Sequence, residues 1–191
     1  GTTVSAWRRI RFALLDRFVL RRVRQWLGLN NLTDAVTGAA PVSEDLVDWY
    51  LALGIPLREA FGMTELGSAT FLPLEADHMI GKGSCGITGP FRECKVVDAE
   101  GKEVPRGEIG EMVVRGSGIL LGYYKKPEAN KEAFFGDWFR TGDLFRQDEA
   151  GYFYIVGRLK EMIRRSSENV PAREVEAVLK DLPEIVESAV I

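Results

Sequence analysis

Three short polar segments contain the side chains of this sequence that are best suited to chemistry. They are Phe61-Gly62-Met63-Thr64-Glu65, Trp138-Phe139-Arg140-Thr141-Gly142-Asp143-Leu144 and Gly157-Arg158-Leu159-Lys160. Each lies between apolar runs, which is typical of a loop that carries a site. A carboxylate such as Asp143 can accept both hydroxyls of a ribose, Glu65 can bind a hard cation, and the forked guanidinium of Arg158 suits a phosphate. Their occurrence in one chain and in this order is a signature rather than an accident.

In this order, the segments resemble the ATP-handling motifs of the adenylate-forming enzymes, which include acyl-CoA synthetases, peptide-synthetase adenylation domains and firefly luciferase. The resemblance extends from about Gly38 to the end of the sequence. It implies a ligase that joins a carboxylate to ATP, releases pyrophosphate, and passes the acyl group of the acyl-AMP to coenzyme A. It also implies ATP or AMP, Mg²⁺ and coenzyme A as cofactors, and a carboxylic acid as the substrate. The stretches around Gly38 and Arg164 are more similar to those of fatty or aryl acid ligases than to amino-acid adenylation domains, and a fatty acid is the expected substrate.

By the resemblance, the nucleotide contacts small, aromatic and polar residues. The implied nucleotide-binding residues are Gly38, Ala39, Ala40, Phe61, Gly62, Met63, Thr64, Asp143 and Arg158. The small residues of the Gly38 loop let a base approach the backbone closely, and Phe61 would supply an aromatic wall. Asp143 would accept the ribose hydroxyls, and Arg158 would reach the ribose and phosphate. The alternatives are an Asx turn for Asp143 and a solvated surface position for Arg158.

Thr64 and Glu65 are the implied catalytic residues next to the phosphates. Thr64 would hydrogen-bond the AMP phosphate, and Glu65 would associate with Mg²⁺, because this hard cation prefers oxygen ligands. The pair could instead begin a helix, with Thr64 as its cap. Its position after Phe-Gly-x and ahead of Asp143 favours the role in the site.

Lys160 aligns with the hinge residue of the family. The resemblance implies that a small C-terminal domain turns about this residue between adenylation and thioester formation. The residues from Arg164 onward resemble the loop that faces the thiol-transfer site, but Ser167 stands where the family usually has Gly. A Gly there typically has a positive dihedral that Ser disfavours, so the departure bears on the geometry of the second half-reaction.

Two further elements of the family do not occur in this sequence. No Gly-rich phosphate loop precedes Gly38, and the chain ends at Ile191 before the catalytic Lys of the small domain. We therefore expect a piece of a longer ligase that is inactive in isolation. The alternatives are an acyl-AMP ligase or peptide-synthetase adenylation domain that transfers to a carrier protein, and a non-catalytic nucleotide-binding fragment or pseudoenzyme.

The elements that must position these residues follow an α/β pattern in the first part of the chain. The expected elements are a helix over 4–27 ended by Gly28, a strand over 32–36, a helix over 44–53 capped by Ser43, and a strand over 56–60. Strand, helix and strand in this order predict a parallel layer with site loops at the carboxyl ends of the strands.

From about residue 83 the pattern changes to short strands separated by turns. The expected strands lie over 94–97, 111–115 and 152–156, followed by a helix over 174–180 and a strand over 185–191. The first three predict a small antiparallel β-subdomain over about 83–157. The resemblance divides the chain into the C-terminal part of the large AMP-binding domain, 1–159, and the hinge and beginning of a small α+β lid domain, 160–191.

The composition is that of an ordinary globular domain, with 46% hydrophobic and 28% charged residues and a net charge of −3. This charge gives no case for a nucleic-acid partner, and no apolar run approaches the roughly 20 residues of a membrane-spanning helix. Cys85 and Cys94 lack a C-x-x-C spacing, so reduced thiols and a cytoplasmic location are expected. His78 has no second His or Cys ligand near it in sequence and is expected in a loop.

The first 24 residues depart from this average, because they hold seven Arg and a single acid, Asp16. Trp7, Ile10, Leu14 and Phe18 recur at helical spacing and predict one apolar face. A basic amphipathic helix can lie on a membrane or mimic a transit peptide. The alternative, which we favour, is a surface helix of the enzyme domain with its Arg face in water.

Overall fold

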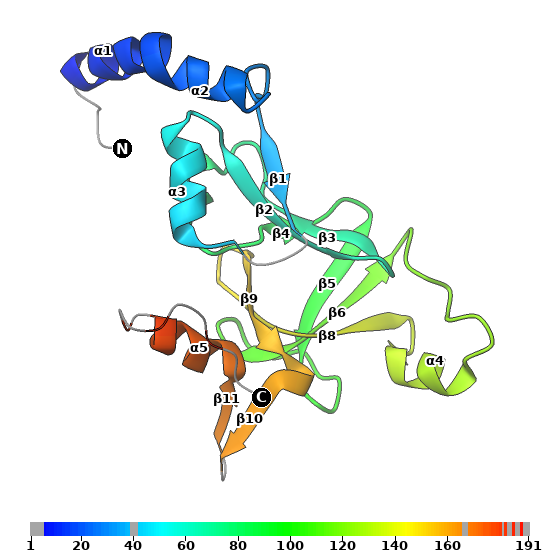
Figure 1. Ribbon diagram of the computed structural model, residues 1–191. Coiled ribbons are helices and arrows are strands. Elements are labelled where there is room, and N and C mark those ends of the chain that lie inside the picture. The colour runs from blue at the N-terminus through cyan, green and yellow to red at the C-terminus, as the bar shows by residue number, and fades with distance from the viewer. Residues whose placement is uncertain are drawn as a thin grey trace.

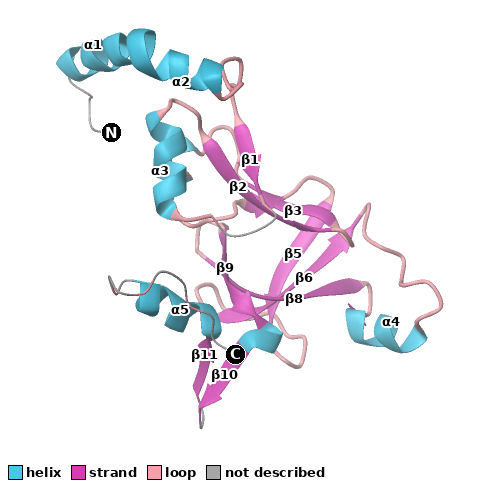
Figure 2. Cartoon of the chain, in the orientation of Figure 1, coloured by secondary structure: helices cyan, strands magenta, loops and turns pink. Residues whose placement is uncertain are grey.

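Two larger groups of β-strands, a separate two-stranded hairpin and peripheral helices make up the described part of the chain (Figures 1 and 2). The computed structural model describes residues 6–38, 42–165 and 168–180, and the single residues Leu182, Ile185 and Ser188. One strand group follows the N-terminal helices, and the other forms the centre of the molecule in Figure 1. This mixture of helices and sheets confirms the predicted α/β class.

A continuous helical segment begins the described chain, as predicted for residues 4–27. It consists of α1 (Ala6–Leu15), a π-helical turn (Asp16–Leu20) and α2 (Arg21–Trp26). Gly28 follows it at a left-handed φ of 75°, as expected of a glycine that ends a helix. The Arg24 side chain donates to the Leu53 carbonyl at 2.5 Å, which ties the segment to the next helix along the chain. The predicted apolar residues lie open on the surface, Trp7 being 74% and Phe18 59% exposed.

The predicted strand–helix–strand unit is present, and its two strands are parallel. Its elements are β1 (Ala35–Thr37), α3 (Glu44–Ala52) and β2 (Leu57–Met63). Ala35 pairs with Leu57, and the Ser43 hydroxyl caps α3 by accepting from the Leu46 amide at 3.4 Å, as predicted. Val47 of α3 and Leu57 of β2 belong to one buried cluster, which holds the helix on the sheet. Burial of such a side chain contributes about 1.5–3 kcal/mol.

Beyond residue 60 the structure corrects the predicted parallel layer. β2 does not end there but continues through Phe61–Met63 and pairs antiparallel with β3 (Gly67–Phe71), which pairs antiparallel with β4 (Ile87–Thr88). These four strands form one sheet in the order β1-β2-β3-β4, in which β1 and β2 are the parallel pair. The prediction therefore holds for that pair alone, because the Gly-Ser-Ala start of β3 gives little strand signal.

The predicted antiparallel strands are present in the second part of the chain. The elements are β5 (Arg92–Val97), β6 (Ile109–Gly116), α4 (Pro127–Ala133), β7 (Phe134–Phe135), β8 (Trp138–Gln147) and β9 (Phe153–Arg158). Their order is β5-β6-β8-β7, and β9 also pairs with β8. Met112, Phe139, Phe145 and Phe153 fill the core of this sheet, and none of them is more than 2% exposed.

A hairpin and a helix follow β9. They are reached through a 3₁₀ turn (Leu159–Glu161) and consist of β10 (Met162–Arg165), β11 (Glu168–Pro171) and α5 (Ala172–Lys180). The predicted helix over 174–180 is present and begins two residues earlier, whereas the hairpin was not predicted. The hairpin extends away from the central sheet (Figure 1). The predicted strand over 185–191 lies mostly outside the described residues, and the domain boundary at Lys160 stays a prediction.

Candidate active site

Asp143 lies in an irregular stretch of β8 rather than in the loop that the sequence predicted. On the neighbouring strand β6, Val113 pairs with Arg140 and Glu111 pairs with Leu144, so residues 141–143 of β8 lie opposite Met112 alone. Gly142 adopts a φ of 71°, which an L side chain disfavours, and so permits this bulge. The sequence Thr-Gly-Asp was read as a tight turn because its Gly is a turn residue, but the strand continues on both sides.

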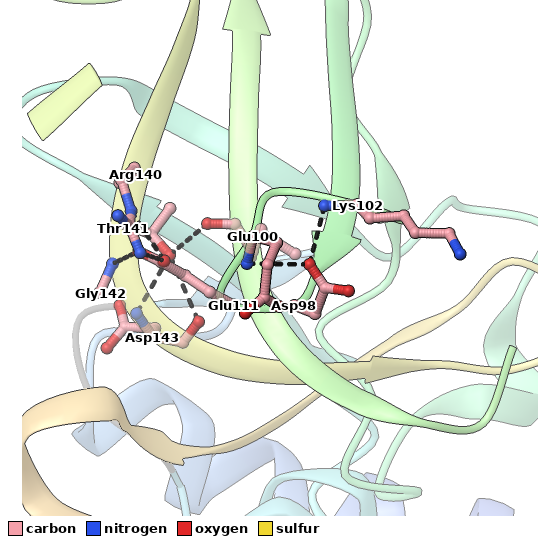
Figure 3. Close-up of polar contacts among 9 residues, drawn as sticks. Asp98, Glu100, Lys102, Glu111, Arg140, Thr141, Gly142 and Asp143 are labelled. Atoms are coloured by element: carbon pink, nitrogen blue, oxygen red, sulfur yellow. Dashed lines mark hydrogen bonds and ion pairs between the residues drawn. The ribbon is translucent and has the colours of Figure 1, made fainter. Parts of the chain in front are cut away.

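Side chains on both strands hold the bulge in place (Figure 3). The Thr141 hydroxyl donates to the Met112 carbonyl at 2.7 Å and accepts from the Asp143 amide at 3.1 Å. The Glu111 carboxylate is 5% exposed; it accepts from the Gly142 amide at 3.0 Å and from the Arg140 Nε at 2.9 Å. Sequence reasoning assigned no role to Glu111. Glu111 was expected to begin the strand over 111–115, but the sequence does not show which carboxylate faces the bulge.

The structure brings Asp143 and Arg158 together, as expected of residues that share a site. They are directly opposed on β8 and β9, and the Arg158 Nε lies 3.4 Å from the Asp143 Oδ1. The Asp143 side chain is 7% exposed, whereas that of Arg158 is 66% exposed. Burial raises the pKa of the Asp143 carboxyl, the positive charge of Arg158 opposes this shift, and the negative charges of Glu161 and Glu111 add to it. A buried acceptor thus lies beneath a cation that solvent can reach.

Thr64 and Glu65 lie in the turn of the β2–β3 hairpin, which corrects the alternative in which Thr64 caps a helix. Thr64 is exposed, Glu65 is half-buried, and Leu66 anchors the turn at 0% exposure. A Cβ on Gly62 would stand 2.5 Å from the Gly67 carbonyl oxygen, so the close approach of the two strands requires Gly at this position. The hairpin therefore presents a hydroxyl and a carboxylate at its tip.

Phe61 does not form the open aromatic wall that was expected for a base. It is 8% exposed, and its ring packs edge-to-face on Phe145 with centroids 4.9 Å apart. Such aromatic pairs contribute about 0.5–1.5 kcal/mol beyond burial. Because Phe145 follows Asp143 by two residues, this ring contact joins the strand that leads to the Thr64 turn and the strand that carries Asp143.

The remaining predicted residues are partly within the described structure. Gly38 follows β1, where a Cβ would lie 2.7 Å from the Ala60 carbonyl oxygen, so this position needs a residue without a side chain. Ala39, Ala40 and Ser167 lie outside the described residues. Lys160 is exposed in the 3₁₀ turn after β9, and its role as a hinge stays a prediction.

Glu65 offers a single carboxylate for a cation. The described residues contain no cluster of three or more His, Cys, Asp or Glu side chains that could hold a metal ion. Magnesium ordinarily takes one or two carboxylates and completes its shell with phosphates and water, so one carboxylate beside the Thr64 hydroxyl fits its needs. His78 is exposed in a short 3₁₀ turn (Asp77–Met79), in keeping with the expected loop position.

Two cysteine thiols lie in the interior near the strands of the site. The Cys85 Sγ donates to the Phe153 carbonyl at 3.3 Å, and the Cys94 Sγ donates to the Ala69 carbonyl at 3.7 Å. Both thiols are free, and burial raises the pKa of each to about 11. No described helix is long and apolar enough to cross a membrane.

Comparison with known proteins identifies the family of the chain. A profile of the AMP-binding enzymes matches residues 7–124. Feruloyl-CoA synthase from an Amycolatopsis species is 38% identical over 164 residues, a match that covers 85% of this chain and 33% of that protein. ATP-bound MatB from Rhodopseudomonas palustris aligns with a TM-score of 0.74 and 38% identity over 82% of this chain and 31% of its own.

The same fold occurs in the amide bond synthetase McbA from Marinactinospora thermotolerans, with a TM-score of 0.75 and 31% identity. That match covers 85% of this chain and 34% of that one. The chain thus spans about a third of the length of these relatives. With its family profile and its paired Asp143 and Arg158, the chain belongs to the AMP-binding, adenylate-forming enzymes.

Proposed function

We propose that this chain carries part of the nucleotide site of an AMP-forming acid–thiol ligase. The reaction joins a carboxylate to the α-phosphorus of ATP with release of pyrophosphate, and coenzyme A then displaces AMP to give a thioester. The observation that carries the proposal is the Asp143 carboxylate, buried in the β8 bulge and opposed by Arg158. A fatty or aryl carboxylic acid is the proposed acyl substrate.

Asp143 is the proposed acceptor for the two ribose hydroxyls. Its carboxylate is buried, and Thr141 and Glu111 fix the backbone around it, so the acceptor is held in place before a ribose binds. Arg158 can turn its exposed guanidinium from Asp143 toward a phosphate. Gly38, Ala39 and Ala40 are the proposed small-residue contact for the adenine, and Gly62 and Met63 are further proposed nucleotide-binding residues.

Thr64 and Glu65 are the proposed residues at the phosphates. The exposed Thr64 hydroxyl can donate to a phosphate oxygen, and Glu65 would hold Mg²⁺, which supplies charge neutralisation at the phosphates when bound. Lys160 is the proposed pivot between this site and the residues that follow. Its position in the 3₁₀ turn after β9, two residues beyond Arg158, supports that role.

A second acceptor is supported by one particular likeness. The amide bond synthetase that shares the fold is 31% identical to this chain, and its name indicates an amine rather than a thiol as the acyl acceptor. Both acceptors follow the same adenylation step. The choice among coenzyme A, an amine and a carrier-protein thiol is therefore a choice of second half-reaction.

The test uses the longer protein that contains this chain. Pyrophosphate release with ATP and a panel of fatty and aryl acids should identify a substrate, and consumption of coenzyme A should follow in the same mixture. Asp143→Asn removes the charge but keeps the shape, so ATP use should fall by about 10- to 100-fold, which corresponds to one charge-assisted contact. Asp137→Asn, at an exposed position nearby, is the matched control and should behave as the unaltered protein.

Two results would contradict the proposal. Pyrophosphate release that is absent with every acid would exclude the ligase, and equal ATP use by Asp143→Asn and Asp137→Asn would exclude Asp143 as the ribose acceptor.

A further inference from the structure

Glu65 is bound from outside its own hairpin by a second segment, residues 117–126 between β6 and α4. The Leu120 amide donates to the Glu65 carbonyl at 2.7 Å, which fixes the backbone of the turn. The Tyr123 hydroxyl donates to the Glu65 Oε1 at 3.2 Å. Among the residues that the structure describes, this phenol is the hydrogen-bond donor to that carboxylate, and it engages one of the two oxygens.

Asn130 of α4 fixes Tyr123 in turn. The Asn130 Oδ1 accepts from the Tyr123 amide at 2.6 Å, and the Asn130 Nδ2 donates to the Tyr123 carbonyl at 3.1 Å. A Cβ at Gly122 would approach the Asn130 Nδ2 to 3.2 Å, so the chain passes close to this side chain. The Asn130 side-chain amide thus binds both the N–H and the carbonyl of Tyr123. This fixes the backbone from which the phenol reaches Glu65.

The contact between Tyr123 and Glu65 has a definite direction. The phenol O–H is the donor, and the carboxylate accepts from it on Oε1. A donor on Oε1 limits the rotation of the carboxylate and leaves Oε2 to face a ligand.

We infer that Tyr123, held by Asn130, is a positioning residue that orients the Glu65 carboxylate toward the magnesium ion of ATP. This inference rests on the proposed function, since it specifies how one residue of that site is aligned. A Glu at the tip of a hairpin samples several rotamers, and each unused rotamer lowers the fraction of molecules ready to bind the cation. Tyr123 raises that fraction without contacting the reactants.

The central experiment measures metal dependence in the longer protein. Tyr123→Phe removes only the hydroxyl, and Tyr124→Phe removes that of its neighbour, which is 84% exposed. Pyrophosphate release is recorded against free Mg²⁺ at saturating ATP. Tyr123→Phe should raise the half-activating Mg²⁺ concentration about tenfold and recover its maximal rate at high Mg²⁺, because one hydrogen bond to a charged group is lost. Tyr124→Phe should leave the curve unchanged.

A binding measurement supplies a readout that does not depend on turnover. The affinity for Mn²⁺ in the presence of ATP, followed by the electron paramagnetic resonance of the free ion, should fall about tenfold in Tyr123→Phe and not in Tyr124→Phe. The Mn²⁺ affinity of Glu65→Gln should fall at least as far as that of Tyr123→Phe. The double variant Tyr123→Phe/Glu65→Gln should match Glu65→Gln alone, because Tyr123 acts through that carboxylate.

The outcomes separate this inference from the proposed function. If Glu65→Gln shifts the metal dependence but Tyr123→Phe does not, or if the two effects add fully, the inference is wrong and the function stands. If the parent releases no pyrophosphate with any acid, both are wrong. Melting temperatures verify that each variant folds. Asn130→Ala releases the backbone of Tyr123 but keeps the phenol, so it should raise the half-activating Mg²⁺ concentration by less than Tyr123→Phe does. No shift in either variant overturns the inference.

Discussion

Asp143 lies within a strand with 5% of its surface exposed, whereas Glu65 lies at the tip of a hairpin and is half-buried. The backbone around Asp143 is fixed by Thr141 and by Glu111, both of which belong to the same sheet. The Glu65 side chain depends instead on Tyr123, which comes from a separate segment. One carboxylate is thus placed by the fold itself and the other by a hydrogen bond that a small movement can break.

The difference suits the two roles proposed for these residues. A ribose is a rigid ligand with two fixed hydroxyls, and a preformed acceptor binds it with little reorganisation. The carboxylate proposed for the cation has no such frame, so the fraction of molecules ready to bind depends on the one donor that orients it. The comparison predicts that loss of the side chain that supports the Asp143 bulge, Glu111, acts first on stability, and that loss of the Tyr123 hydroxyl that orients Glu65 acts first on metal dependence.

The largest expected effect follows the loss of Glu111. Glu111→Ala leaves the Gly142 amide and the Arg140 guanidinium without their buried acceptor and should cost about 3 kcal/mol. This corresponds to a fall of roughly 10 °C in the melting temperature of a unit of this size. Glu108→Ala, on an exposed residue of the same region, is the control. Similar melting temperatures for the two variants would mean that the bulge does not depend on Glu111.

An intermediate loss of stability is expected when a glycine of the Glu65 hairpin is replaced and the carboxylate itself is left unchanged. Gly62→Ala places a methyl 2.5 Å from the Gly67 carbonyl oxygen, so the two strands must separate, at about 2 kcal/mol. Gly136→Ala has a left-handed φ of 58° but open space around its Cβ, and should cost about 1 kcal/mol from strain alone. Chemical denaturation would measure both, and a smaller effect at Gly62 than at Gly136 would contradict the close approach.

The smallest change in stability is expected when the charge of Asp143 is removed, and this change depends on pH. Because burial raises the pKa of this carboxyl above its ordinary value of 3.8, the folded state holds the proton more tightly than the unfolded chain. The stabilisation from protonation is complete below the unfolded pKa and disappears as the pH rises through the folded pKa. Asp143→Asn should therefore melt at an equal or slightly higher temperature at pH 7. This advantage should shrink toward pH 3. If Asp143→Asn melts at a lower temperature than the unaltered protein at pH 7, folding does not raise the pKa of Asp143.

Much of the fold followed from local signals in the sequence. The helix capped by Ser43, the end of the first helical segment at Gly28, and the strands β5, β6 and β9 were predicted to within a few residues. Each has a cap, a turn or a hydrophobic alternation within its own stretch of chain. Such features need no knowledge of distant partners.

The parts that were missed depend on contacts between distant residues. β8 was read as a loop because Gly142 interrupts it, and the bulge is held partly by Glu111, 31 residues earlier, which accepts from the Gly142 amide. Phe61 was read as a ligand wall, but its contact with Phe145 places it in the core. Tyr123 and Asn130 were assigned no role in the site, and the hydrogen bond from Tyr123 to Glu65 spans 58 residues. The pairing of Asp143 with Arg158 was anticipated only because the family resemblance joined the two segments.

The two buried thiols make this chain convenient for spectroscopy. Burial raises the pKa of Cys85 and of Cys94 to about 11, so both side chains remain thiols at pH 7, and alkylating dyes and spin labels should react with neither in the folded protein. A single cysteine introduced at the exposed Lys160 would then be labelled without removal of the native ones. A label at that residue would report any rotation of the segment after β9, and the native cysteines would remain unlabelled.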